Sequence, residues 1–170
     1  MVKGQIGSAS YFTDQLWDLI NSDRLDEREK ARSEWRANAE LYARDYEGLR
    51  TRLPRDISEF FQKNDFHDYR IVDFKITQTQ NGPKFPVSVV LIVSNSDDKW
   101  TIAYSRVSRI SLDFISGTSS YEIGRGLDHW GYDEFAAVDH DTLSHEILFA
   151  SGATLLVHFK DKHISLSRLR

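Results

Sequence analysis

The sequence carries a hairpin signal at residues 143–160, which read Leu143-Ser-His-Glu-Ile-Leu-Phe-Ala150, Ser151-Gly152 and Ala153-Thr-Leu-Leu-Val-His-Phe-Lys160. Two runs rich in Leu, Ile, Val and Phe flank the Ser-Gly pair, and glycine readily takes the positive φ that a two-residue hairpin loop requires. We therefore expect two antiparallel strands joined at Ser151-Gly152. With that loop, Leu148 faces Leu155 and His145 faces His158.

The predicted register places two imidazoles side by side on one sheet face. Directly opposed residues have Cβ atoms about 5 Å apart, which is near enough for His145 and His158 to share a metal ion. A third ligand would have to come from Asp139, His140 or Asp141, whose place in space the spacing does not determine. The alternatives are an ordinary half-buried histidine pair and a register slipped by one residue, and we expect no cofactor.

Length and composition indicate one domain with its own core. The 170 residues are 40% hydrophobic and 12% aromatic and include no cysteine, so neither a disulfide nor a metal is needed for stability. We expect a single domain over residues 1–170, with a frayed end at 1–10, a helical segment at 11–65 and a sheet at 69–170. Without an apolar run of membrane-spanning length or a secretory signal, the sequence predicts a cytoplasmic protein. The net charge of −4 disfavours nucleic-acid binding.

Helical spacing dominates the first part of the chain. It predicts a short helix after Thr13, a long helix from about Leu25 to Arg52, and a third helix that follows Pro54 and ends at Asn64-Asp65. The long helix carries an apolar stripe at three- and four-residue steps: Ala31, Trp35, Ala39, Tyr42, Tyr46, Leu49 and Leu53. This stripe fits the cover of a sheet and, as the alternative, a dimer interface, so the chain is a monomer or a homodimer.

From Tyr69 onward the hydrophobic period changes to the alternation of strands. Arg70–Gln78 alternates as a half-covered strand, Phe85–Val93 is apolar on both faces, and Trp100–Phe114 keeps one parity around an interruption at Arg106. Further strands are expected at 132–138 and near Ile164, and a long loop at 116–131. The fold class is therefore α+β, with three N-terminal helices packed on one face of a six- to seven-stranded antiparallel meander sheet.

Familiar catalytic motifs are missing from the sequence. Without cysteine there is no thiol nucleophile, and no serine lies in a Gly-x-Ser-x-Gly elbow. Gly124-Arg125-Gly126 lacks the context of a phosphate loop, and His145-Glu146 lacks the second histidine of the zinc-protease motif. We expect His67-Asp68 to cap the turn between helices and sheet.

An acidic segment is the most usable functional feature. Seven acidic residues stand between Glu122 and Glu146, against the single Arg125. Such a segment can steer a basic protein partner, and aromatic residues within it are typical interface anchors. The candidate partner-binding residues are Trp130, Tyr132, Asp133, Glu134, Asp139 and Asp141; the alternative is a solvated loop.

Short motifs throughout the chain resemble a family of uncharacterised bacterial proteins, a domain of unknown function that opens with a Tyr-Phe-Thr motif. They are Tyr11-Phe12-Thr13, Leu16-Trp17, Asn21-Ser22, Arg52-Leu53-Pro54, Phe66-His67-Asp68, His145-Glu146-Ile147-Leu148-Phe149, Gly152 and Phe159-Lys160-Asp161. This chain departs from the pattern in the ten residues before Tyr11 and in the loop at 116–131. The resemblance implies a bacterial origin and a helices-then-sheet order, and it carries over no catalytic residue.

Two functional hypotheses follow from these features. The first is a non-enzymatic cytoplasmic binding protein, in its sharpest form an immunity-type protein that neutralises a basic toxin through an acidic surface. The alternative is a small metal-dependent hydrolase that uses His145 and His158 with His140 or Asp141.

Overall fold

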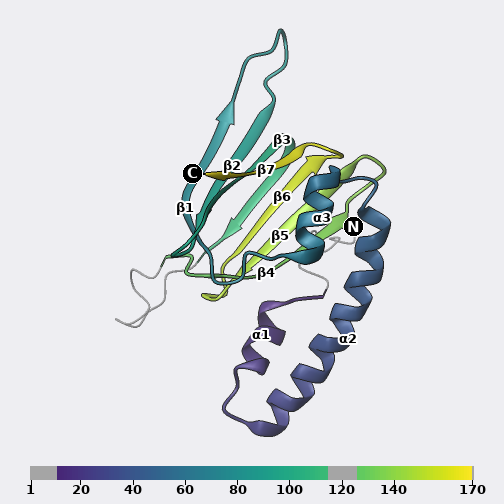
Figure 1. Cartoon of the computed structure of the whole chain (residues 1–170), viewed down its shortest axis with the longest axis vertical. Helices are drawn as coiled ribbons and strands as arrows, with labels where there is room; N and C mark the ends of the chain where they lie inside the picture. The colour runs from purple at the N-terminus through teal and green to yellow at the C-terminus, as the bar shows by residue number, and fades with distance from the viewer. Residues whose placement is uncertain (1–10, 115–125, 170) are drawn as a thin grey trace, which may run out of the picture.

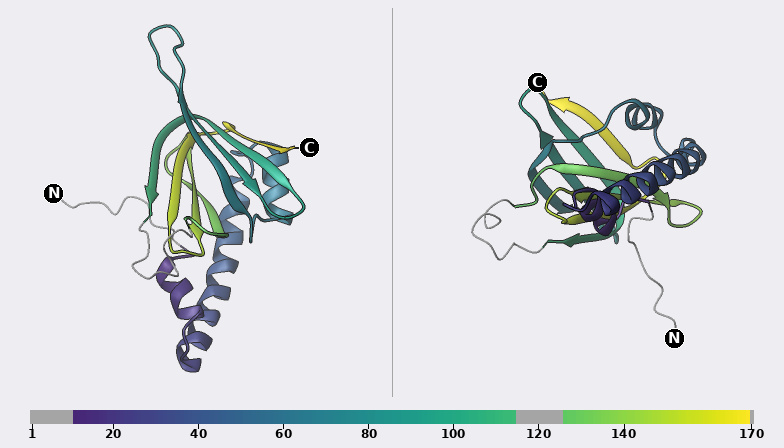
Figure 2. Two further views of the ribbon diagram at one scale, coloured as in Figure 1. Left: turned by 90° about the vertical axis from the view of Figure 1, so that its left-hand side faces the viewer. Right: turned by 90° about the horizontal axis from the view of Figure 1, so that it is seen from below.

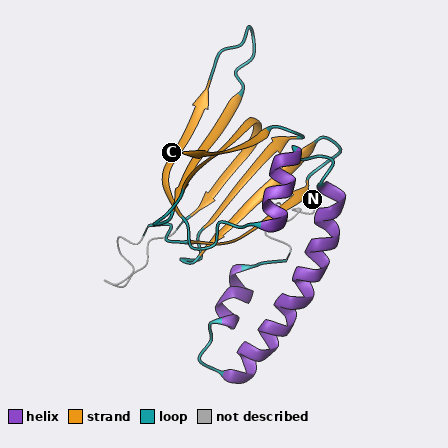
Figure 3. Ribbon diagram, viewed as in Figure 1, coloured by secondary structure: helices purple, strands orange, loops and turns teal. Residues whose placement is uncertain are grey.

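The computed structural model describes residues 11–114 and 126–169, and these form an α+β fold in which helices precede an antiparallel sheet (Figures 1 and 3). The helices are α1 (Asp14–Ile20), α2 (Leu25–Leu49) and α3 (Arg55–Lys63). The strands are β1 (Arg70–Gln78), β2 (Val87–Ser94), β3 (Lys99–Asp113), β4 (Trp130–Ala137), β5 (Thr142–Phe149), β6 (Thr154–Lys160) and β7 (Ile164–Leu169). The predicted fold class is confirmed, whereas the predicted end at 1–10 and most of the predicted loop at 116–131 lie outside the described residues.

The three predicted helices are present, although α2 ends at Leu49, three residues before the predicted end at Arg52. Thr13 caps α1, since its hydroxyl accepts a hydrogen bond from the Leu16 N–H at 3.2 Å. Pro54 stands at the N-cap of α3 and Asn64 at its C-cap, because proline is tolerated at a helix start and not in its interior. None of the described helices combines the length and apolarity that crossing a bilayer would require.

The strand order departs from a simple meander. Neighbours follow the order β1-β2-β3-β6-β5-β4, and β7 pairs with β3 outside this path. The long strand β3 makes this order feasible, because Arg106 takes a positive φ of 50° and bends the strand there. Its first half lies between β2 and β7, while its second half, from Val107, pairs with β6. The predicted interruption at Arg106 is thus confirmed as a bend.

The register predicted for the β5–β6 hairpin is wrong by one residue. Phe149 and Ala153 form the last pair, with the Phe149 N–H donating to the Ala153 carbonyl at 2.9 Å. The loop therefore holds three residues, and Gly152 takes the positive φ (82°) that such a loop needs at its last position. His145 consequently faces Val157, and His158 faces Ser144. Because a one-residue slip moves a side chain to the other sheet face, the two histidines do not form the predicted pair.

The core lies on the concave face of the curved sheet, under α3 and the second half of α2 (Figure 2). The first half of α2 and α1 extend past the sheet on the β4 side (Figure 1). Tyr46, Leu49 and Leu53 of the predicted stripe are buried against the sheet. The largest fully buried side chains include Trp130, Tyr104, Phe66, Phe149, Phe159, Leu53, Ile57 and Leu91.

Arg52 ties the end of the helical segment to the far end of the sheet. Its guanidinium donates to both carboxylate oxygens of Asp161, at 2.9 and 2.8 Å. The same group donates to the carbonyls of Asp139 and Thr142, at 2.8 and 3.1 Å. One side chain therefore joins the β4–β5 connection to the β6–β7 turn, and both lie far from Arg52 in the sequence.

Candidate functional site: an acidic aromatic pocket beside β4

A pocket of about 270 Å³ lies between the helices and β4. One wall comes from α2, a second from the end of α3 and the following turn, and the floor from the start of β4. Its lining residues are Tyr42, Ala43, Tyr46, Glu47, Phe61, Gln62, Asn64, Asp65, His67, Gly131, Tyr132 and Asp133. The pocket thus combines aromatic rings with carboxylates.

A bulge in β4 determines which side chains reach the pocket floor. In a regular strand Trp130 and Asp133, three residues apart, point to opposite faces. Gly131 is the extra residue between the Trp130–Phe149 and Tyr132–Leu148 pairs, and it sits so close to β5 that an added Cβ would meet the Leu148 carbonyl oxygen at 3.0 Å. The bulge restores a common face for Trp130 and Asp133, and the Trp130 indole N–H donates to Asp133 Oδ1 at 3.1 Å.

A buried histidine contacts the second oxygen of the Asp133 carboxylate. His145 is fully buried and its Nε2 lies 2.9 Å from Asp133 Oδ2. Its Nδ1 lies 2.7 Å from the Tyr104 hydroxyl, and its ring stacks on Phe135 with 4.0 Å between centroids. A neutral imidazole satisfies both contacts when the Tyr104 O–H donates to Nδ1 and the Nε2–H donates to Asp133. His145 therefore orients Asp133, and its own nitrogens are occupied.

The phenols around the pocket experience negative charge as well as burial. Burial, and after it the charge of Asp133, raises the pKa of Tyr42 and of Tyr104 well above the usual value. Burial raises the pKa of Tyr46 to about 12, and Asp133 adds to this effect. Burial followed by the charges of Asp65 and Asp68 raises the pKa of Tyr132. These phenols stay protonated at neutral pH and sit in a field that favours cations.

The raised pKa values predict a loss of stability at alkaline pH. The folded state favours the neutral phenol, so the contribution of Tyr46 is fully present below its unfolded pKa of 10.0 and is lost as the pH rises towards its folded pKa of about 12. We expect the free energy of unfolding, measured in urea, to fall across this window. The variant Tyr46→Phe should show a shallower fall. A free energy of unfolding that stays level from pH 10 to pH 12 would contradict the assignment.

The structure distributes the predicted partner-binding residues over three environments. Trp130 and Glu134 are buried, at 1% and 4% exposure, and so do not lie on an outer contact surface. Tyr132 and Asp133 line the pocket. Asp139 and Asp141 lie in the turn between β4 and β5. The predicted acidic segment is therefore not one continuous surface.

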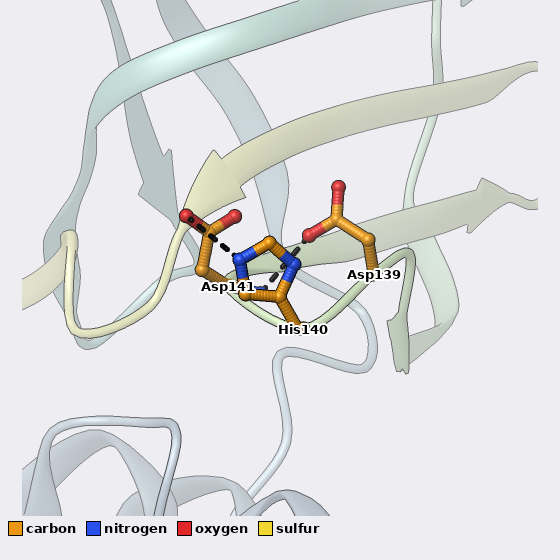
Figure 4. Close-up of side chains that lie close together, drawn as sticks. All are labelled: Asp139, His140 and Asp141. Carbon is orange, nitrogen blue, oxygen red and sulfur yellow. Dashed lines mark hydrogen bonds and ion pairs between the residues drawn. The ribbon is translucent and has the colours of Figure 1, made fainter.

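The turn residues Asp139, His140 and Asp141 form the one group of possible metal ligands among the residues that the structure describes (Figure 4). Each already has a local role or neighbour. Asp139 Oδ1 accepts the Asp141 N–H at 3.0 Å, which shapes the turn. Asp141 pairs with Lys160, and this pairing lowers the pKa of Asp141 to about 2. The group is explained by turn formation and carries no metal assignment.

The remaining predicted ligands are separated from that turn. His145 is enclosed in the core and His158 is half-buried on the other sheet face, next to Arg109 on β3. Burial and the positive charge of Arg109 lower the pKa of His158. The His67 imidazole lies 3.1 Å from the Asp68 carboxylate, and the backbone N–H of His67 donates to Asp65 Oδ1. The His67-Asp68 doublet therefore shapes the turn between helices and sheet, as predicted.

Sequence reasoning missed the residues that build the pocket walls and the buried Tyr104 that contacts His145. The helical pattern places Tyr42, Phe61 and Asp65 only on helix faces and ends, and the alternation places Tyr104 only in a strand. A signal was present at Gly131, because an isolated glycine at the start of a strand pattern indicates a bulge or a close backbone approach. Applied to β4, that rule would have brought Trp130 and Asp133 to one face.

Comparison with protein-family profiles found no match, and comparison with curated proteins found no relative of this chain. The resemblance to a domain of unknown function stays a prediction.

Proposed function

We propose that this chain is a non-enzymatic binding protein that engages a basic protein partner through the acidic aromatic pocket beside β4. In its most specific form it is a bacterial immunity-type protein that neutralises a toxin in the cytoplasm. The observation that carries the proposal is the Asp133 carboxylate, which is held by two buried donors on the floor of a pocket lined by aromatic rings. An ordered anion among aromatic rings suits recognition of a cation.

Binding is favoured over hydrolysis by the state of the histidines. A general base must reach the proton that it removes, but His145 is fully buried and uses both ring nitrogens inside the protein. His158, its proposed metal-binding partner, lies on the other face of the sheet. The pocket instead offers carboxylates, phenol rings and a single imidazole, which are common elements of a recognition site.

The proposal is tested with the protein products of the neighbouring genes: whether this chain binds any of them, and whether it protects cells from one that inhibits growth. Each product is co-expressed with this chain, and complexes are measured by titration calorimetry. We expect one basic product to bind with an affinity that falls as salt rises, because charge pairs contribute to association. We also expect this chain to restore the growth of cells that the product alone inhibits. Failure of all neighbouring products to bind, together with no restored growth, would overturn the proposal.

A further inference from the structure

Asp133 retains acceptor capacity on the side that faces the pocket. An ionised carboxylate offers about four acceptor positions. Within the described part of the chain, one donor reaches each of its oxygens: the Trp130 indole on Oδ1 and the His145 imidazole on Oδ2. The side chain is 10% exposed, and that exposed part belongs to the pocket lining. Two acceptor positions, one on each oxygen, are therefore left for a ligand.

The carboxylate is also preorganised. Both donors belong to side chains of the core, since Trp130 is 1% exposed and His145 is fully buried. Asp133 therefore cannot rotate towards solvent without leaving an indole N–H and an imidazole N–H unsatisfied in the interior, which is unfavourable. The free-energy cost of ordering the Asp133 carboxylate when a ligand binds is therefore small.

Size and charge limit what fits. The volume of about 270 Å³ lies just below the range of about 300–1,000 Å³ that is typical of pockets for drug-sized ligands, so a group the size of one side chain is appropriate. Asp65 adds negative charge at the rim, while Glu47 is partly neutralised because it pairs with Arg50 at 2.8 Å. His67 is the one basic residue in the lining.

We propose, as a deepening of the proposed function on which it rests, that the pocket receives the guanidinium group of an arginine side chain of the partner. A guanidinium presents two parallel N–H donors that match the two oxygens of a carboxylate, and its flat face stacks on aromatic rings such as Tyr42, Phe61 and Tyr132. A lysine ammonium is a more strongly hydrated point charge that cannot contact both oxygens in this way. An arginine side chain can therefore contact the Asp133 carboxylate and the aromatic rings at the same time.

The probe for this inference is Nα-acetyl-arginine amide, titrated into the full chain and followed by amide chemical shifts. We expect saturable binding with shifts at residues 131–133, and binding at least about tenfold weaker for the matched lysine and citrulline derivatives. Citrulline keeps the shape of the side chain but carries no charge. Equal affinity for arginine and citrulline would overturn the role of charge, and equal affinity for arginine and lysine would overturn the guanidinium assignment.

The variant Asp133→Asn tests the counter-ion. It keeps the size of the side chain and an oxygen that accepts from His145 or Trp130, and we expect it to weaken arginine binding at least about tenfold. Asp73→Asn, on the exposed far edge strand β1, is the matched control and should leave the affinity unchanged. Should Asp133→Asn unfold, Tyr132→Leu serves as the second variant: it removes a ring on which the guanidinium stacks, so it should weaken arginine binding, and an unchanged affinity would overturn the inference.

The outcomes separate this inference from the function it rests on. If a basic partner binds and Asp133→Asn does not weaken the complex, the guanidinium pocket is wrong and the binding function stands. If the arginine derivative binds and no neighbouring gene product does, the pocket chemistry stands and the protein partner is wrong. If the arginine derivative does not bind to the folded wild-type chain, the inference is overturned.

Discussion

The variant Trp130→Ala is expected to unfold with a free energy about 3–5 kcal/mol below that of the wild type, the usual cost of removing a buried tryptophan. Trp130 packs against Phe66, His145 and Phe149, with ring centroids 5.4, 5.8 and 6.4 Å away. The substitution opens a cavity in the core and removes the indole donor to Asp133 Oδ1. Equilibrium unfolding in urea measures the loss.

Two further tryptophan variants separate the loss of the indole N–H donor from the loss of packing. Trp130→Phe keeps an aromatic ring but not the N–H, so it should retain much of the packing and cost about 1–3 kcal/mol for the donor that Asp133 loses. Trp17→Ala removes a half-buried tryptophan of α1 that packs on Trp35 and Tyr132. It should cost clearly less than Trp130→Ala. A loss for Trp130→Ala no greater than that for Trp17→Ala would contradict the central position assigned to Trp130.

The second large effect is expected at Arg52, where alanine should lower the free energy of unfolding by about 2–3 kcal/mol, in the range for hydrogen bonds to charged groups. Asp161 and the carbonyls of Asp139 and Thr142 lose their donor together. The side chains of Arg52 and Asp161 are 19% and 27% exposed, so water partly replaces the missing donor. The loss should therefore stay below that of breaking a fully buried ion pair, about 3–5 kcal/mol.

Arg52→Lys and Arg55→Ala are the matched controls, with stability again measured in urea. Lysine carries the charge without the planar fork, and we expect it to restore only part of the stability. Arg55 is 91% exposed and pairs within its own helix, with Glu59, so its replacement by alanine should leave stability unchanged. Equal effects of Arg52→Ala and Arg55→Ala would show that Arg52 does not join the turns as described.

Local signals in the sequence predicted the helices well. Thr13, Pro54 and Asn64 stop or start helices through their own backbone and side-chain chemistry, which acts whatever the rest of the fold is. The same holds for the bend at Arg106, where the alternation of β3 is interrupted. The strand order was not predictable from local signals, because it depends on which strands pair with each half of β3.

The candidate site was harder to predict because two single-residue effects control it. The three-residue loop at Gly152 places His145 opposite Val157 and away from His158, and the bulge at Gly131 moves Asp133 to the face of Trp130. Each effect reverses the face of every side chain beyond it. Once both are included, Tyr104, His145 and Asp133 meet, although 41 residues separate the first two.

The pocket is assembled from segments that lie far apart in the sequence. Its walls belong to residues 42–67 and its floor to residues 131–133, so neither half of the polypeptide can carry the pocket alone. Any molecule that occupies it binds the native chain and not the unfolded one, and by mass action it shifts the melting temperature of the entire domain upward. A thermal-shift screen of unlabelled compounds can therefore detect a ligand of the pocket, whichever molecule is its natural ligand.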